Sequence, residues 1–144
     1  MIAMEGRPLY IFTAAQIIAV VMVLWFVFSR PGPWDWQRSI GAALLVAGIA
    51  GIATARYQLG KSFAIQPAAH QLVTRGIYSK IRNPIYVFGL ITIAGFVLVL
   101  DRPILWLLVL AIAIMQALRA HAEAQVLEAA FGDAYRDYRR KTWF

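Results

Sequence analysis

The stretch PIYVFGLITIAGFVLVLDRPILWLLVLAIAIMQAL, residues 84–118, decides the fold. It holds two apolar runs, 84–100 and 103–118, which are separated only by Asp101 and Arg102. Each run approaches the length that a helix needs to cross a hydrocarbon core of about 30 Å. Two helices joined by so short a turn must lie antiparallel. The stretch therefore predicts a tight helical hairpin inside a membrane.

Two further apolar runs precede this hairpin. Residues 9–29 contain no charged residue, and residues 39–55 are rich in glycine and alanine, which suit close helix packing in lipid. The first run is too long for the core of a cleavable signal peptide, and no small-residue cleavage site follows it before Pro31. The glycines of the second run are too loosely spaced to predict a specific dimer motif. The sequence thus predicts an all-α, polytopic transmembrane bundle with four spans, at about 9–29, 39–55, 84–100 and 103–118.

The composition agrees with a membrane protein of one domain, residues 1–144. The chain is 61% hydrophobic and only 15% charged. A soluble domain is nearer half apolar and about a quarter charged, so the additional apolar surface needs lipid to cover it. The absence of cysteine excludes disulfides, thiolate nucleophiles and cysteine-ligated metals. With two histidines and no His-x-Glu-x-x-His pattern, we expect no metal site.

The basic residues predict how the spans are oriented. The net charge of +7 could indicate a nucleic-acid partner, but the positions of the charges favour cytoplasmic loops, and no nucleic acid is expected. Only Arg30, Arg38 and Arg102 fall on one side of the predicted spans, together with Trp34 and Trp36, which fit an interfacial aromatic belt. The other side holds eleven basic residues: Arg7, Arg56, Lys61, Arg75, Lys80, Arg82, Arg119, Arg136, Arg139, Arg140 and Lys141. The positive-inside rule therefore places both termini and segment 56–83 in the cytoplasm of a multi-pass protein of the cell (inner) membrane.

The first polar constellation lies where the third span begins. Asn83 suits an N-cap and Pro84 suits the first helical position. The N–H groups and the positive dipole end of such a helix attract an anion such as a carboxylate, and Arg82 adds positive charge beside them. The alternative is a capped helix at the membrane edge with a snorkelling arginine.

The second polar constellation lies where the fourth span leaves the membrane. Gln116, Arg119 and Glu123 are three and four residues apart and therefore share one helix face. Ionisable residues at the edge of a bundle are functional candidates, because lipid-facing charge is costly. The alternative is an ordinary i,i+4 ion pair. His121 fits an interfacial position, and the basic tail 131–141 could simply be an amphipathic segment attracted to anionic lipid.

Together these segments resemble the isoprenylcysteine carboxyl methyltransferase family and its phospholipid N-methyltransferase relatives. The resemblance covers roughly residues 60–141 and keeps the order and the spacing of two motif blocks. The first block reads His70-x-Leu72-Val73-Thr74-x-Gly76-x-Tyr78, followed by Arg82-Asn83-Pro84-x-Tyr86. The second reads Arg119-x-x-x-Glu123-x-x-x-Leu127-x-x-x-Phe131-Gly132-x-x-Tyr135-x-x-Tyr138.

The resemblance implies a cytoplasmic pocket for S-adenosyl-L-methionine and a lipophilic acceptor that enters from the bilayer. It implies that Arg119 faces the acceptor as the catalytic residue. It also implies a set of cofactor-binding residues: Gln66, His70, Gln71, Leu72, Val73, Tyr78, Asn83, Pro84, Ile85, Tyr86 and Glu123. Two positions depart from the family pattern, since Asn83 replaces a histidine and Ala124 replaces the second glutamate of a pair.

The chemistry leaves the acceptor open. A carboxylate needs no general base and could be oriented by the Arg119 fork, so carboxyl O-methylation of a prenylated or other lipophilic substrate is our first expectation. The runner-up is N-methylation of a phosphatidylethanolamine-type headgroup, whose amine must first lose a proton to a base such as Glu123 or a histidine. A non-catalytic membrane protein with a lipid-binding tail is the alternative from another class.

Overall fold

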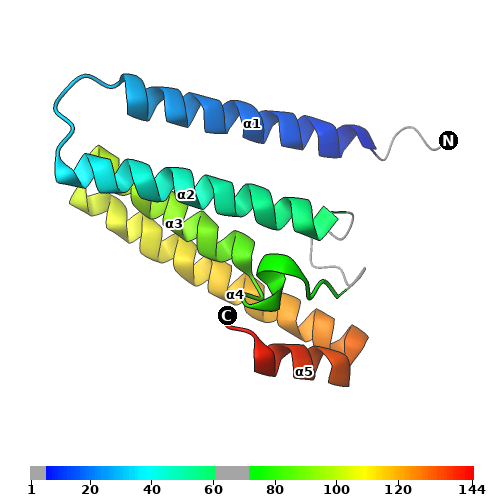
Figure 1. The fold of residues 1–144 in the computed structure, drawn as a ribbon. Coiled ribbons are helices and arrows are strands. Elements are labelled where there is room, and N and C mark those ends of the chain that lie inside the picture. The colour runs from blue at the N-terminus through cyan, green and yellow to red at the C-terminus, as the bar shows by residue number, and fades with distance from the viewer. Residues whose placement is uncertain (1–5, 61–71) are drawn as a thin grey trace. The chain divides into compact units, whose positions relative to one another are not determined.

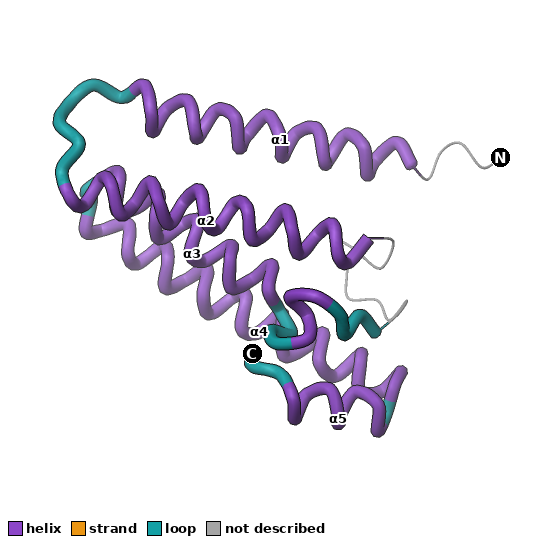
Figure 2. Tube along the Cα trace, in the orientation of Figure 1, coloured by secondary structure: helices purple, strands orange, loops and turns teal. Residues whose placement is uncertain are grey.

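The computed structural model describes residues 6–60 and 72–144, and Figures 1 and 2 show that the elements there are helical. This confirms the predicted all-α class. Short 3₁₀ turns, η2 (Gly76–Ser79) and η3 (Pro103–Leu105), precede α3 and α4. The α-helices of the described residues are α1 (Gly6–Ser29), α2 (Trp36–Leu59), α3 (Pro84–Leu100), α4 (Trp106–Phe131) and α5 (Asp133–Lys141).

The chain divides into two compact units, Met1–Asp35 and Trp36–Phe144. The first unit holds α1 and an aromatic turn, in which the ring centroids of Phe28 and Trp34 lie 5.6 Å apart. The second unit holds all the other helices, and both predicted polar constellations fall within it.

In the second unit α3 packs against both α2 and α4 (Figure 1). Glycines permit the close approach of α2 and α3. A Cβ atom at Gly41 would lie 2.7 Å from the carbonyl oxygen of Gly95, and a Cβ atom at Gly48 would lie 2.9 Å from that of Phe88. The α2 glycines therefore serve packing within the chain.

The predicted hairpin between the third and fourth spans is present. Asp101 ends α3 in the left-handed conformation, with φ of 51°, and its N–H donates to the carbonyl oxygens of Val97 and Leu98 at 3.1 and 3.2 Å. The Gln37 side chain donates to the Asp101 carboxylate at 2.7 Å and so ties α2 to this turn.

The fourth helix extends beyond the predicted span, as the shared helix face of Gln116, Arg119 and Glu123 requires. It continues from the apolar run to Phe131, well past residue 118. Its apolar part leaves Leu107, Met115 and Leu118 63%, 67% and 68% exposed, which is the surface that lipid would cover. One face of α4 therefore extends from the apolar region to the polar end of the unit.

Two helical stretches of the described residues are long and apolar enough to cross a membrane, Trp36–Leu59 and Pro103–Phe131. Thr13–Ser29 and Pro84–Leu100 are shorter apolar helices. Two of the four predicted spans therefore meet a length criterion, while the four-span topology and its orientation stay predictions.

Candidate functional site

Tyr86 of the first motif block meets Arg119 and Glu123 of the second polar constellation in one hydrogen-bonded cluster. The Tyr86 hydroxyl donates to Glu123 Oε1 at 2.5 Å. The Arg119 Nε group donates to the same oxygen at 3.3 Å. Tyr86 comes from α3 and the other two residues come from α4, so the hairpin brings together groups that lie 37 residues apart in the chain.

The cluster is partly shielded from solvent. The Glu123 side chain is 25% exposed, whereas that of Arg119 is 46% exposed. Glu123 therefore sits in the seam between the helices, and Arg119 lies at its margin, where an incoming group can reach the guanidinium. Such an arrangement offers one anionic and one cationic group side by side on a single helix face.

Helix α3 begins beside this cluster. Pro84 is the first helical residue, as the sequence indicated, and the structure shows that it is fully buried. Asn83 occupies the N-cap position, but its side chain makes no capping hydrogen bond, so that part of the prediction is wrong. Its backbone serves instead: the Asn83 carbonyl accepts from the N–H groups of Tyr86 and Val87 at 3.1 and 3.2 Å.

Residues 142–144, here termed the C-terminal strip, pair with the segment that leads into α3. The Trp143 N–H donates to the Lys80 carbonyl at 2.7 Å, and the Arg82 N–H donates to the Trp143 carbonyl at 2.9 Å. The Asn83 N–H donates to the Phe144 carbonyl at 2.9 Å. These bonds form a parallel bridge centred on Ile81 and Trp143. The strip therefore holds the N-terminal end of α3 in place.

Tyrosine hydroxyls strengthen this connection. The Tyr138 hydroxyl of α5 donates to the Tyr78 carbonyl at 2.7 Å. Burial raises the pKa of Tyr138 to about 12, with a further contribution from Tyr135. Burial also raises the pKa of Tyr78, which is 6% exposed. Both phenols are therefore neutral near pH 7; the Tyr138 hydroxyl acts as a donor, and the Tyr78 ring is buried.

The end of α2 anchors η2. The Ile77 N–H donates to the Gln58 side-chain oxygen at 2.7 Å, and Gly76 has a φ of 60°. A Cβ atom at Gly76 would meet only the flexible end of the Gln58 side chain, so the positive φ is the main reason for a glycine here. The glycine of the first motif block thus has a conformational role.

The structure places the other expected cofactor-binding residues as follows. Ile85 is half-buried in the first turn of α3, and Leu72 and Val73 are half-buried on the non-helical segment before η2. Gln66, His70 and Gln71 lie outside the described residues. His121 is exposed on α4, where its ring approaches the Gln125 side chain at 3.2 Å.

Gln116 lies on the helix face that carries Arg119 and Glu123, and the sequence analysis gave it no role. Its Oε1 atom is buried and has no hydrogen-bond partner within residues 6–60 and 72–144. Its Nε2 atom packs towards α3, since a Cβ atom at Gly89 would lie 3.4 Å from it. The only available signal was that a glutamine interrupts an otherwise apolar run.

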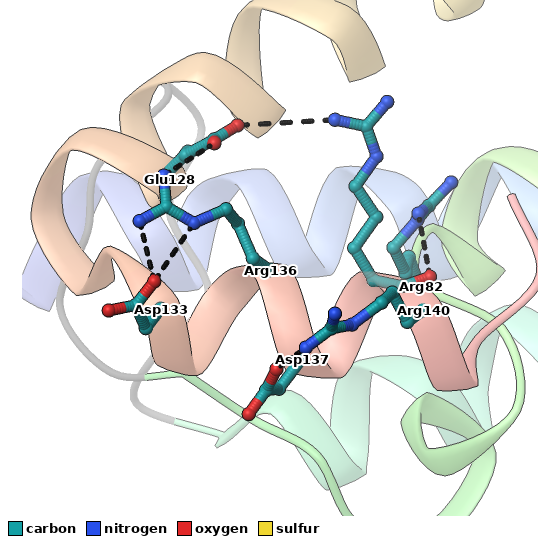
Figure 3. A pocket seen from close by; sticks show the side chains of 7 residues that line it. Arg82, Glu128, Asp133, Arg136, Asp137 and Arg140 are labelled. Carbon is teal, nitrogen blue, oxygen red and sulfur yellow. Dashed lines mark hydrogen bonds and ion pairs between the residues drawn. The ribbon is translucent and has the colours of Figure 1, made fainter.

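A depression of about 500 Å³ lies elsewhere, along α5 (Figure 3). Arg136 pairs with Asp133 at 2.6 Å and with Glu128 at 3.5 Å, and Arg140 pairs with Asp137. Exposed ion pairs of this kind contribute little to stability, and small-molecule pockets are mostly apolar. The depression is therefore a charged surface rather than the cofactor pocket. It is lined by Arg82, Glu128, Asp133, Arg136, Asp137, Arg139 and Arg140.

Apolar helices that carry a tyrosine–carboxylate–guanidinium cluster at one end define a helical membrane protein with a polar site. The model of the phospholipid methyltransferase family matches residues 36–134, more than two thirds of the chain. The chain belongs to the phospholipid methyltransferase family, which is a family of membrane-embedded methyltransferases. The resemblance drawn from the motif blocks is thereby confirmed. No curated protein and no solved structure matches the chain.

Proposed function

We propose that this protein transfers a methyl group from S-adenosyl-L-methionine to the amine of a phospholipid headgroup. The family match supports methyl transfer and favours a phospholipid. The Tyr86–Glu123–Arg119 cluster is the observation that supports the position of the reaction, because it joins the start of one apolar helix to the polar end of another. The same proposal treats residues 1–144 as one functional domain.

The residues present fit this cofactor. Glu123 offers a carboxylate to the ammonium group of the cofactor, and the N-terminal end of α3, at Asn83, Pro84 and Ile85, offers a positive dipole end to its carboxylate. The remaining proposed contacts carry apolar, aromatic or amide groups, as an adenine and a ribose require: Gln66, His70, Gln71, Leu72, Val73, Tyr78 and Tyr86. When bound, S-adenosyl-L-methionine supplies a methyl group already activated by its sulfonium, so the protein needs no covalent nucleophile.

Catalysis by this chain then consists of positioning and of controlling charge. Arg119 would bind the phosphate of the headgroup through its planar donors, since guanidinium and phosphate match in geometry. Only the neutral amine carries the lone pair that accepts a methyl group, so the ammonium form must first lose a proton. The exposed His121 ring is turned to Gln125, so Glu123 is the better candidate for receiving the proton.

A carboxylate acceptor, as in isoprenylcysteine O-methylation, is the second candidate. The 46% exposure of the Arg119 side chain favours it, because the same guanidinium could orient a carboxylate beside the cofactor. Arg119→Lys separates a planar clamp from a simple ion pair. A clamp for phosphate or carboxylate predicts a marked loss of turnover with cofactor affinity unchanged within a few-fold, whereas a simple ion pair predicts full turnover.

We further propose four spans with both termini in the cytoplasm, which would bring the cofactor to the site from the cytoplasmic side. The chain has no cysteine, so single cysteines introduced at residues 34, 68 and 141 are unique labels. Residue 34 should react with an impermeant reagent from outside, and residues 68 and 141 only after permeabilisation. Labelling of residue 68 from outside would contradict the topology.

The proposed reaction is tested with the purified protein in phosphatidylglycerol nanodiscs that contain either phosphatidylethanolamine or a prenylcysteine analogue. Labelled S-adenosyl-L-methionine is added and the lipids are identified by mass spectrometry. Methylated phosphatidylethanolamine is the expected product. A methyl ester of the prenylcysteine analogue would instead establish the second candidate. The absence of both products, with no cofactor binding, would favour a non-catalytic membrane protein.

A further inference from the structure

The C-terminal strip carries an exposed tryptophan. Trp143 is 64% exposed, although its backbone N–H and carbonyl groups are both bonded to the segment that leads into α3. Its ring lies beside that of Phe144, with the centroids 6.0 Å apart. Tryptophan is enriched at the headgroup level of membranes, because its ring is largely apolar and its indole N–H is polar. The strip therefore presents the residue type of an interfacial anchor.

The backbone bonds also fix the level of the strip relative to an apolar helix. The strip is bonded to residues 80–83, and the apolar helix Pro84–Leu100 begins at the next residue. Helix α5 reaches this place because it folds back beside the end of α4, after a turn at Gly132 with φ of 52° (Figure 1). If α3 enters the bilayer at Pro84, as proposed above, the strip lies at the level of the lipid headgroups.

Positive charge is in excess around the strip. The Lys80 and Lys141 side chains are exposed, and no carboxylate of residues 6–60 and 72–144 forms an ion pair with either. Arg82 adds a third cation, since its Nη1 group donates to the Arg139 carbonyl at 3.3 Å. The nearby carboxylates are already paired with arginines of α5 (Figure 3): Asp133 and Glu128 with Arg136, Glu128 also with Arg139, and Asp137 with Arg140.

Few interactions hold the strip in place. Its backbone makes three hydrogen bonds to residues 80–83, and the Thr142 hydroxyl donates to the Tyr138 carbonyl at 2.9 Å. Segments with few contacts near a surface open at a small cost in free energy. A surface that attracts the lysines beside the strip would therefore change the fraction of time for which these bonds are formed.

We propose that Lys80, Lys141 and Trp143 form a docking surface for the headgroups of anionic phospholipids in the membrane, and that docking stabilises the N-terminal end of α3. An anionic membrane surface attracts each nearby basic residue by about fivefold in the binding equilibrium. If the N-terminal end of α3 holds the carboxylate of the cofactor, anionic lipid also raises the cofactor affinity. Only this last consequence rests on the proposed function.

Hydrogen exchange of the Arg82 and Asn83 amides tests the proposal, because these N–H groups donate to the Trp143 and Phe144 carbonyls. Exchange is followed by mass spectrometry in nanodiscs that hold one copy of the protein. The nanodiscs consist of phosphatidylcholine alone or of phosphatidylcholine mixed with phosphatidylglycerol. Cofactor affinity is measured by calorimetry in the same nanodiscs.

The test variant is Lys80→Gln/Lys141→Gln, which removes both charges and leaves the backbone bonds of the strip intact. Lys80→Arg/Lys141→Arg is the matched control, because it makes the same two replacements and keeps the charges. Arg102→Gln is a second control, which removes a cation at the other end of α3.

In the wild type, phosphatidylglycerol should slow the exchange of the two amides about fivefold or more, the size of the attraction of one basic residue. Added sodium chloride should cancel this slowing, because it screens the charges. The arginine variant and Arg102→Gln should respond like the wild type. The glutamine variant should exchange at the same rate in both kinds of nanodisc, and its cofactor affinity should not respond to phosphatidylglycerol.

Two outcomes would overturn the docking surface. One is exchange in the wild type that does not respond to phosphatidylglycerol, and the other is a full response in the glutamine variant. Slowing that appears only with two copies in one nanodisc, whatever the lipid, would assign the surface to a second copy of the chain and overturn the proposal as well. If exchange responds as expected but the wild type binds no cofactor, the docking surface stands and the proposed function fails.

Discussion

The hydrogen bond between Tyr86 and Glu123 should be measurable as a coupling between α3 and α4. Tyr86→Phe removes only the hydroxyl that donates to Glu123 at 2.5 Å. A hydrogen bond to a charged group contributes about 1.5–3 kcal/mol. Because Glu123 is 25% exposed and also accepts from Arg119, water and the guanidinium can partly replace the lost donor. We therefore expect a loss of about 1.5 kcal/mol, at the lower end of that range.

A double-mutant cycle isolates this interaction. Tyr86→Phe, Glu123→Gln and the double variant are unfolded with denaturant in detergent micelles, and the free energies of unfolding are compared. The two substitutions should couple by about 1–2 kcal/mol, as expected for residues in direct contact. Tyr57→Phe, at a tyrosine that is 88% exposed, is the control and should have no effect. Additive effects of the two substitutions would refute the contact that unites the two motif blocks.

Three further outcomes test the surroundings of the site. Gly48→Ala should destabilise the protein by about 1–3 kcal/mol in the same assay, because its Cβ would lie 2.9 Å from the Phe88 carbonyl oxygen, whereas Ala47→Val on the exposed side should be nearly neutral. Trp143→Pro removes the N–H that donates to the Lys80 carbonyl and should weaken cofactor affinity several-fold in calorimetry. Trp143→Ala keeps that N–H and should have a smaller effect. Equal effects of the two substitutions would mean that the indole, and not the backbone bond, supports cofactor binding. The neutral Tyr138 hydroxyl stabilises the fold below its ordinary pKa of 10.0, and this stability should be lost as the pH rises through about 12. The difference in near-ultraviolet absorbance between the wild type and Tyr138→Phe should show this step, and a difference that appears already near pH 10 would contradict the burial.

The sequence predicted the bounds of the third helix well, because a residue that favours a helix boundary stands at each end. Pro84 and Asp101 bound the third helix, and the structure begins and ends it at residues 84 and 100. The span predicted at 103–118 followed the apolar residues alone, and the shared helix face of Arg119 and Glu123 already implied that the helix continues beyond it. The end of the helix at Phe131 had no hydropathy signal, because the residues after 118 mix polar and apolar side chains.

The motif blocks selected residues whose side chains meet in the structure, but they did not predict the contacts, and the binding roles of these residues stay predictions. Tyr86 and Glu123 were both assigned from the motif blocks, yet their hydrogen bond depends on the register of α3 against α4. The C-terminal strip could not have been predicted, because its bonds to Lys80, Arg82 and Asn83 join backbone groups that every residue carries. Those bonds also explain the failed cap: the Asn83 backbone is held by the strip, and its side chain does not return to the helix.

The central claim is that Glu123 in the Tyr86–Glu123–Arg119 cluster binds the cofactor, and cofactor affinity tests it most directly. S-adenosyl-L-methionine is titrated by calorimetry into the wild type, Glu123→Ala and the matched control Glu128→Ala, whose carboxylate also pairs with arginines but lies in the α5 depression. The wild type and Glu128→Ala should bind with equal affinity, and Glu123→Ala should bind about tenfold or more weakly, as the loss of a charge-assisted hydrogen bond requires. Equal affinity for all three proteins, or no binding by the wild type, would contradict the claim.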